Sequence, residues 1–149
     1  MDTIREVQLT PLKIIEGQTG NVMHALKASE VSFKGFGEVY LSTVHYNAVK
    51  GWKKHSRMIL NIIVPVGAIR FVLFDGRKES ETCGMIQEVI LSKNNYKRLT
   101  VPPGVWMAFQ GMSEGENILM NVASIPHDPE EAENLDLHNA FIPYKGFSA

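Results

Sequence analysis

The sequence lacks the features that mark secreted and membrane-spanning proteins. Cys83 is its single cysteine, which excludes a disulfide framework within the chain and a zinc site built from cysteines. The opening residues, MDTIREVQL, have no apolar core of the kind that signal peptides carry. The longest apolar run, around residues 62–67, is far too short to span a bilayer. We therefore expect a cytoplasmic protein that makes no contact with membranes.

An excess of charge of either sign is also missing. Lys and Arg together number 15 and Asp and Glu 16, which gives a formal net charge of −1. No overall field attracts nucleic acid, so we expect no nucleic-acid partner, and a site for an anion must be built by local cations. The 149 residues, 44% of them hydrophobic, suffice for a buried core, and we expect residues 1–149 to form one domain.

Long amphipathic helices are absent, and only residues 128–134 look helical, with a proline near the start and acids in the first turn. The rest of the chain divides into short segments that are β-branched or alternate polar with apolar residues, separated by Pro and Gly. We expect an all-β antiparallel sandwich or barrel of jelly-roll type. The expected strands include residues 7–15, 21–27, 37–45, 60–64, 67–75, 85–91, 96–101, 106–111 and 117–123.

One short stretch, KGWKKHSRM at residues 50–58, combines four cations with a histidine, His55. Residues two apart in a strand point to the same face, so Lys53 and His55 share a face and Lys54 points to the other. Cations at the end of a strand are often only solvated surface that protects a sheet edge. If the face of His55 is the interior, however, the stretch forms the rim of an anion site.

Three stretches in this order resemble one family: KGWKKH at 50–55, GAIRFVLFD at 67–75 and PGVWMAF at 103–109. They resemble the cupin-fold sugar epimerases related to dTDP-4-dehydrorhamnose 3,5-epimerase, and also their relatives, the nucleotide-sugar 3,4-ketoisomerases. The resemblance spans residues 17–130. It implies a cupin-type jelly roll that binds a nucleotide-diphosphate sugar, assembles as a homodimer and serves the synthesis of surface polysaccharide or O-antigen sugars.

Several catalytic positions of the family carry other residues here. Of the two histidines in the family's R-G-x-H-x-H strand, the first falls at Lys53 and the second at His55. The tyrosine of T-x-Y-Y-x-P falls at His127, and the histidine of P-x-G-x-x-H falls at Met107. The glutamate of an N-terminal R-G-x-[FL]-x-E stretch falls at His24.

The chemistry of the resembled family assigns roles to the residues that remain. Removing a proton next to a ketone requires a base that works near neutral pH, and we expect His55 to supply it. Lys53 would stabilise the developing enolate oxygen, and His127 would return a proton to the opposite face of the sugar. The further substrate contacts that we expect are Lys50, Arg57, Trp106 and His24.

A metal is the other cupin possibility. Metal-binding cupins carry two early histidines, an acidic residue and a later histidine as ligands. Here Lys53 and Met107 stand at two of these positions, and no acidic residue follows His55 at the required spacing. We expect neither metal nor cofactor.

The function predicted is epimerisation of a nucleotide-linked 4-keto-6-deoxysugar at C3, C5 or both. Three alternatives stay open: 3,4-ketoisomerisation, a cupin that binds a nucleotide sugar without turning it over, and a structural partner in a larger sugar-modifying complex.

Overall fold

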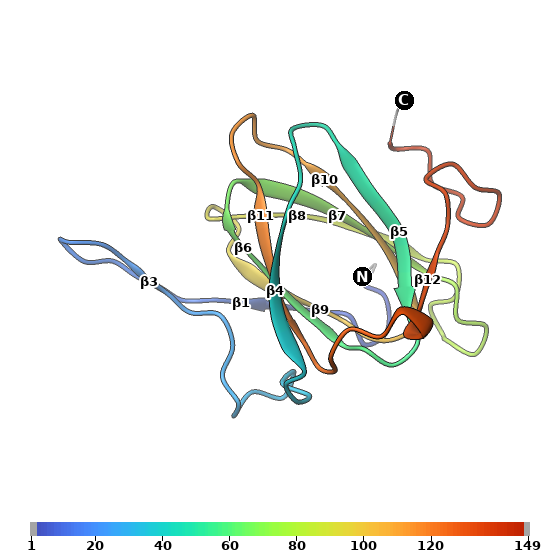
Figure 1. The fold of residues 1–149 in the computed structure, drawn as a ribbon, viewed down its shortest axis with the longest axis horizontal. Coiled ribbons are helices and arrows are strands. Elements are labelled where there is room, and N and C mark those ends of the chain that lie inside the picture. The colour runs from blue at the N-terminus through green and yellow to red at the C-terminus, as the bar shows by residue number, and fades with distance from the viewer. Residues whose placement is uncertain (1–2, 148–149) are drawn as a thin grey trace.

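Two five-stranded antiparallel sheets face each other in the computed structural model, which describes residues 3–147 (Figure 1). This arrangement confirms the predicted all-β sandwich. The first sheet has the order β1 (Gln8–Pro11), β9 (Lys97–Val101), β6 (Leu60–Val66), β11 (Ile118–Ala123), β4 (Glu38–Thr43). The second has the order β12 (Ala132–Asn134), β5 (Val49–His55), β10 (Val105–Gly111), β7 (Ala68–Asp75), β8 (Ile86–Ser92). No helix within residues 3–147 has the length and hydropathy needed to cross a membrane.

The main core lies between the sheets and follows the alternation of the strands. In β7, Ile69, Phe71 and Leu73 point into this core, whereas Val72 and Phe74 belong to a second apolar cluster. Because β7 is central in its sheet and apolar on both faces, its sequence reads as a nearly continuous hydrophobic run. Burying each of these large side chains stabilises the fold by about 1.5–3 kcal/mol.

The second cluster covers the outer face of the second sheet. Trp52 of β5 and Trp106 of β10 are both almost fully buried in it, and Ile142 and Phe147 from the C-terminal segment pack on them. The indole N–H of Trp52 donates to the backbone carbonyl of Leu137. The C-terminal segment therefore forms a third layer over this sheet.

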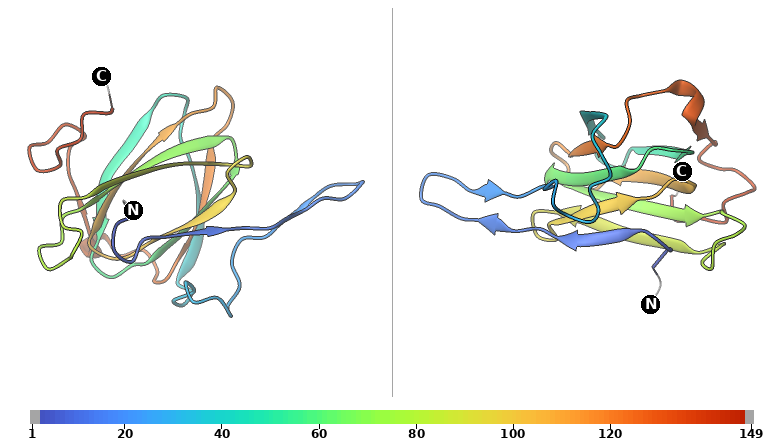
Figure 2. Two further views of the ribbon diagram at one scale, coloured as in Figure 1. Left: turned by 180° about the vertical axis from the view of Figure 1, so that it is seen from behind. Right: turned by 90° about the horizontal axis from the view of Figure 1, so that it is seen from below.

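A two-stranded hairpin of β2 (Ile14–Ile15) and β3 (Val22–Met23) extends away from the sandwich, as both views in Figure 2 show. After the hairpin, the chain returns over the outer face of the first sheet. There Glu30 forms an ion pair with the fully buried Arg98 of β9 at 2.8 Å, and Arg98 also donates to the backbone carbonyl of Ala25.

The prediction of a helix over residues 128–134 was wrong beyond its first turn. Asp128 caps a 3-10 helix of three residues, Pro129–Glu131, and accepts a hydrogen bond from the backbone N–H of Glu130. From Ala132 the chain becomes β12, which pairs with β5. Pairing with an existing strand satisfies these backbone groups, whereas an isolated helix of two turns is marginal in water.

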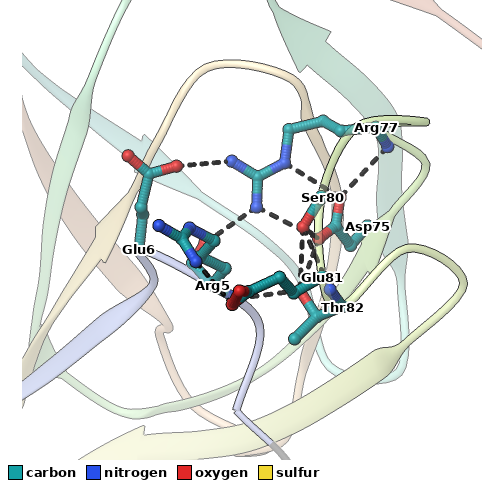
Figure 3. A network of polar contacts seen from close by, with 7 residues as sticks. All are labelled: Arg5, Glu6, Asp75, Arg77, Ser80, Glu81 and Thr82. Atoms are coloured by element: carbon teal, nitrogen blue, oxygen red, sulfur yellow. Dashed lines mark hydrogen bonds and ion pairs between the residues drawn. The ribbon is translucent and has the colours of Figure 1, made fainter.

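The N-terminal segment is held by a polar cluster around Asp75, at the end of β7 (Figure 3). The fully buried carboxylate of Asp75 accepts hydrogen bonds from the guanidinium of Arg77 and the hydroxyls of Ser80 and Thr82. Burial opposes ionisation, but these hydrogen bonds outweigh it and hold the pKa of Asp75 well below its usual range. Arg77 also forms an ion pair with Glu6. The cluster therefore joins the segment that precedes β1 to the turn that follows β7.

We predict that Asp75→Asn lowers the free energy of unfolding by about 3–5 kcal/mol, because it leaves Arg77 without its buried counter-ion. The native pKa of Asp75 is depressed, so its contribution is present above the unfolded pKa of about 3.9 and is lost as the pH falls below it. Urea unfolding at pH 7 and at pH 3 measures both effects. Glu81→Gln, at an exposed ion pair of the same cluster, is the control; equal losses in both variants would contradict the prediction.

Candidate active site

A cavity of about 620 Å³ opens between the two sheets, within the size range of small-molecule sites. Strands β4 and β11 of the first sheet form one wall, and β5 and β10 of the second form the other. Figure 1 shows β4 and β5 on facing sides of the sandwich. The first wall contributes Glu38, Tyr40, Ser42 and Asn121, and the second contributes Lys50, Lys53, His55, Met107 and Phe109; His127 lies on the loop between them.

His55 ends β5 and is held in one orientation by a buried carboxylate. Its ring Nδ1 lies 2.7 Å from Oε1 of Glu131, whose side chain is 1% exposed. The other oxygen of Glu131 accepts the backbone N–H groups of Arg57 at 2.9 Å and Met58 at 2.8 Å. A carboxylate at Nδ1 selects the tautomer in which Nδ1 carries the proton, so Nε2 keeps its lone pair. The pair is suited to accepting a proton at Nε2.

The groups around Glu131 stabilise its charged form. Burial opposes ionisation, but hydrogen bonds from His55 and from the backbone N–H groups of Met58 and Arg57 outweigh it and lower the pKa of Glu131 to about 2. Glu131 is therefore an anion throughout the neutral range and can stabilise a positive charge that develops on the imidazole ring.

A β-bulge in β5 brings two lysines into the cavity. Lys53 pairs with Met107 and Lys50 with Phe109, so two residues of β5 oppose one residue of β10. Strict alternation would have placed Lys50 and Lys53 on opposite faces, but the bulge turns both toward the cavity. Gly51 makes the close approach possible, because a Cβ there would lie 2.6 Å from the backbone of β10.

The wall opposite His55 is apolar at Leu60, Ile62 and Leu119 but polar along its edge strand. Glu38, Tyr40 and Ser42 of the edge strand β4 point into the cavity, whereas Val39 and Leu41 between them are exposed on the other face. The Tyr40 hydroxyl accepts a hydrogen bond from the side-chain amide of the buried Asn121 at 3.0 Å. None of the predicted site residues lies on this wall, although the alternation of polar and apolar residues over 38–42 indicates a strand with one polar face.

Four of the seven predicted site residues line the cavity together: His55, Lys53, His127 and Lys50. The expected division of faces in β5 also holds, because Lys54 points outward. Its ammonium group pairs with Glu133 at 3.2 Å and lies 5.1 Å from the ring centre of Trp106.

The other three predicted residues are not among the described residues that line the cavity. Trp106 is buried on the outer face of its sheet, because its neighbour Met107 takes the inward position in β10. The Arg57 side chain is 58% exposed and pairs with Asp128, although its backbone N–H binds Glu131. His24 directly follows β3, and its backbone carbonyl accepts a hydrogen bond from the hydroxyl of Tyr96. This geometry gives no support to their predicted contacts.

Glu131 is the main residue that sequence reasoning missed. Its segment has the sequence pattern of a helix start, in which the helix dipole alone explains the acidic residues. Within residues 3–147, no three His, Cys, Asp or Glu side chains are grouped closely enough to hold a metal ion.

Comparison with known proteins agrees with this architecture. The sequence model of the dTDP-4-dehydrorhamnose 3,5-epimerase family matches residues 2–143. A dTDP sugar isomerase from Desulfovibrio desulfuricans is 38% identical; its crystal structure superposes with a TM-score of 0.92, covering 95% of this chain and 91% of that one. The probable low-salt glycan biosynthesis epimerase Agl13 of Haloferax volcanii is 22% identical over 135 residues, 89% of this chain and 86% of the relative. A dTDP-4-dehydrorhamnose 3,5-epimerase from Elizabethkingia anophelis, 16% identical, shares the fold with a TM-score of 0.83 over 97% of this chain and 83% of that one.

We predict that Glu131→Gln destabilises the protein by roughly 2–3 kcal/mol at pH 7, because the native pKa of Glu131 lies below its ordinary value of 4.5. This contribution is present above the unfolded pKa and is lost as the pH falls toward about 2, so the wild type and the variant should converge between pH 5 and pH 2. Denaturant unfolding across this range is the measurement. The exposed neighbour Glu130→Gln is the control, and a difference from wild type that does not change with pH would contradict the prediction.

Proposed function

The chain belongs to the dTDP-4-dehydrorhamnose 3,5-epimerase family, and we propose that it epimerises a nucleotide-diphosphate-linked 4-keto-6-deoxysugar at C3, C5 or both through an enolate. The observation that carries this proposal is the pair formed by His55 and Glu131 at the cavity, with Lys53 on the same wall. Solved relatives with bound dTDP or dTDP-sugars support a nucleotide-sugar substrate.

In this proposal His55 is the base. Its Nε2 takes the proton from the carbon beside the ketone, and the charge of Glu131 stabilises the imidazolium that forms. The electron pair of the broken C–H bond moves onto the ketone oxygen. Lys53, on the same strand face as His55, stabilises the resulting enolate oxygen, and Lys50 contributes a positive charge for the diphosphate.

Inversion also requires a proton donor for the other face of the sugar. The sequence predicts His127 for this role, and His127 lines the cavity together with Tyr40, another side chain that can donate a proton. The reaction needs no group beyond these side chains, so the proposal includes neither metal nor cofactor.

The principal alternative is 3,4-ketoisomerisation. It is favoured by the position of His55, which matches the second and not the first histidine of the related strand motif. Both reactions begin with removal of a proton next to a ketone. They differ in the product, because the ketone moves in one and a carbon centre inverts in the other. A cupin that only binds the nucleotide sugar is the remaining alternative, and it would show no proton exchange at all.

For the biological setting, we propose a cytoplasmic enzyme that makes activated sugars for surface polysaccharide. The glycan biosynthesis named for the Haloferax relative supports the setting. We also propose a homodimer. The projecting hairpin supports it, because Ile15 is 48% exposed and Val22 60% exposed there, and such apolar residues are suited to contact with a second copy.

We predict that the wild type exchanges the C3 or C5 proton of a nucleotide-linked 4-keto-6-deoxysugar with deuterium in D₂O, and that His55→Gln slows this exchange by about 10²–10⁴-fold because the base is lost. Proton NMR on a panel of such sugars gives the exchanging carbon and, from the product, whether the ketone has moved. The exposed His138→Gln is the matched control. Exchange at the wild-type rate in His55→Gln would reject His55 as the base, and no exchange by the wild type would favour a binding protein.

We predict that the wild type runs at twice the mass of one chain in size-exclusion chromatography with light scattering, and that Ile15→Lys shifts it toward the monomer. Ile90→Lys tests the same chemical change at a residue of similar exposure, 44%, on β8 outside the hairpin. A monomeric wild type, or the same response to both substitutions, would contradict the prediction.

A further inference from the structure

The proposed epimerisation places a geometric demand on the cavity. Once a base has removed the proton from one face, the enolate carbon is planar, and inversion requires a new proton from the other face. Because His55 belongs to the second sheet, the wall of the first sheet lies across the cavity from it, and side chains of that wall can reach the other face. The polar residues on this wall are Glu38, Tyr40, Ser42 and Asn121.

Among these side chains, Tyr40 has the chemistry of a proton donor. A phenol holds its proton at neutral pH and can release it in a transition state. A carboxylate has no proton to give at that pH, an amide does not act as an acid, and an aliphatic hydroxyl is a much weaker acid than a phenol.

The Tyr40 hydroxyl is also held in place by a hydrogen bond from a buried side chain. Tyr40 lies directly across from Asn121 in the pairing of β4 with β11, and its oxygen accepts the Asn121 amide at 3.0 Å. Asn121 is 1% exposed, and its own oxygen is held by the backbone N–H of Asn61 at 3.1 Å. Since the amide occupies a lone pair of the phenol oxygen, the O–H of Tyr40 is free to donate elsewhere, and the same amide stabilises the phenolate that donation leaves behind.

His127 is less constrained. It lies on the exposed loop after β11, and no side chain or backbone group among residues 3–147 forms a hydrogen bond with its ring. A donor that must reach one face of one carbon gains from being held in place, and Tyr40 is held whereas His127 is not.

We infer that Tyr40 is the catalytic acid that delivers a proton to the sugar face opposite His55; this assignment rests on the proposed epimerisation. His55 gains the proton of the broken C–H bond, the enolate collapses to the ketone as the Tyr40 O–H proton bonds to carbon, and Tyr40 is left as a phenolate. The imidazolium then loses a proton to water and the phenolate regains one, so protons and charge balance over the cycle.

Tyr40→Phe tests the inference, because it removes only the hydroxyl. In D₂O the variant should still exchange the substrate's C–H, since His55 can take the proton and return deuterium to the same face. Formation of the inverted product should fall by about 10²-fold or more. NMR on one sample measures exchange and inversion separately, and a variant that had merely unfolded would lose both. Tyr46→Phe, at a tyrosine 47% exposed outside the cavity, is the matched control.

The outcomes separate the two proposals. If the wild type neither exchanges nor inverts, the proposed function fails and the role of Tyr40 fails with it. If the wild type inverts and Tyr40→Phe inverts as fast, Tyr40 is not the donor although the proposed function stands. Loss of inversion with retained exchange in His127→Gln, in place of Tyr40→Phe, would assign the donor to His127 and overturn the inference.

Discussion

The carboxylate of Glu131 holds together the part of the structure on which the site depends. One of its oxygens binds the ring of His55, and the other binds two backbone N–H groups in the turn that follows β5. Its backbone carbonyl accepts both the N–H and the hydroxyl of Ser56, and β12 begins at the next residue by pairing with β5. A single buried anion thus joins the C-terminal segment to the strand that carries the proposed base, and the loss of its charge would loosen both.

The two sheets contribute different chemistry to the cavity. The second sheet supplies the proposed base His55 and two lysines, and the first supplies neutral and acidic oxygen groups with Tyr40 among them. A planar intermediate between the walls would therefore have a base on one side and a fixed hydroxyl on the other. This division follows from the sandwich itself, since facing strands of different sheets approach a ligand from opposite sides.

The chain resembles the family although several of the family's catalytic positions carry other residues. The place of His55 and its hydrogen bond to Glu131 explain how both can hold. Lys53 occupies the position of the usual first histidine, and His55 lies one pleat further along the same face. The histidine at this second position has its own carboxylate partner, which a surface residue without function would not require. The motif is thus altered in its residue types, but a histidine with the hydrogen bonding that a base needs is still present at the cavity.

Most of the strands, and the side chains that share a face of each, could be predicted from the local sequence pattern. Period-two alternation is a local property, so it correctly put Lys53 and His55 together and Lys54 outside. Which groups lie against those faces depends on contacts between distant parts of the chain. Glu131 reaches His55 across 76 residues, and Tyr40 faces it from another sheet, because sheet pairing and layer packing set such contacts. The same long-range packing buried Trp106 away from the cavity, and strand pairing replaced the helix expected after Asp128.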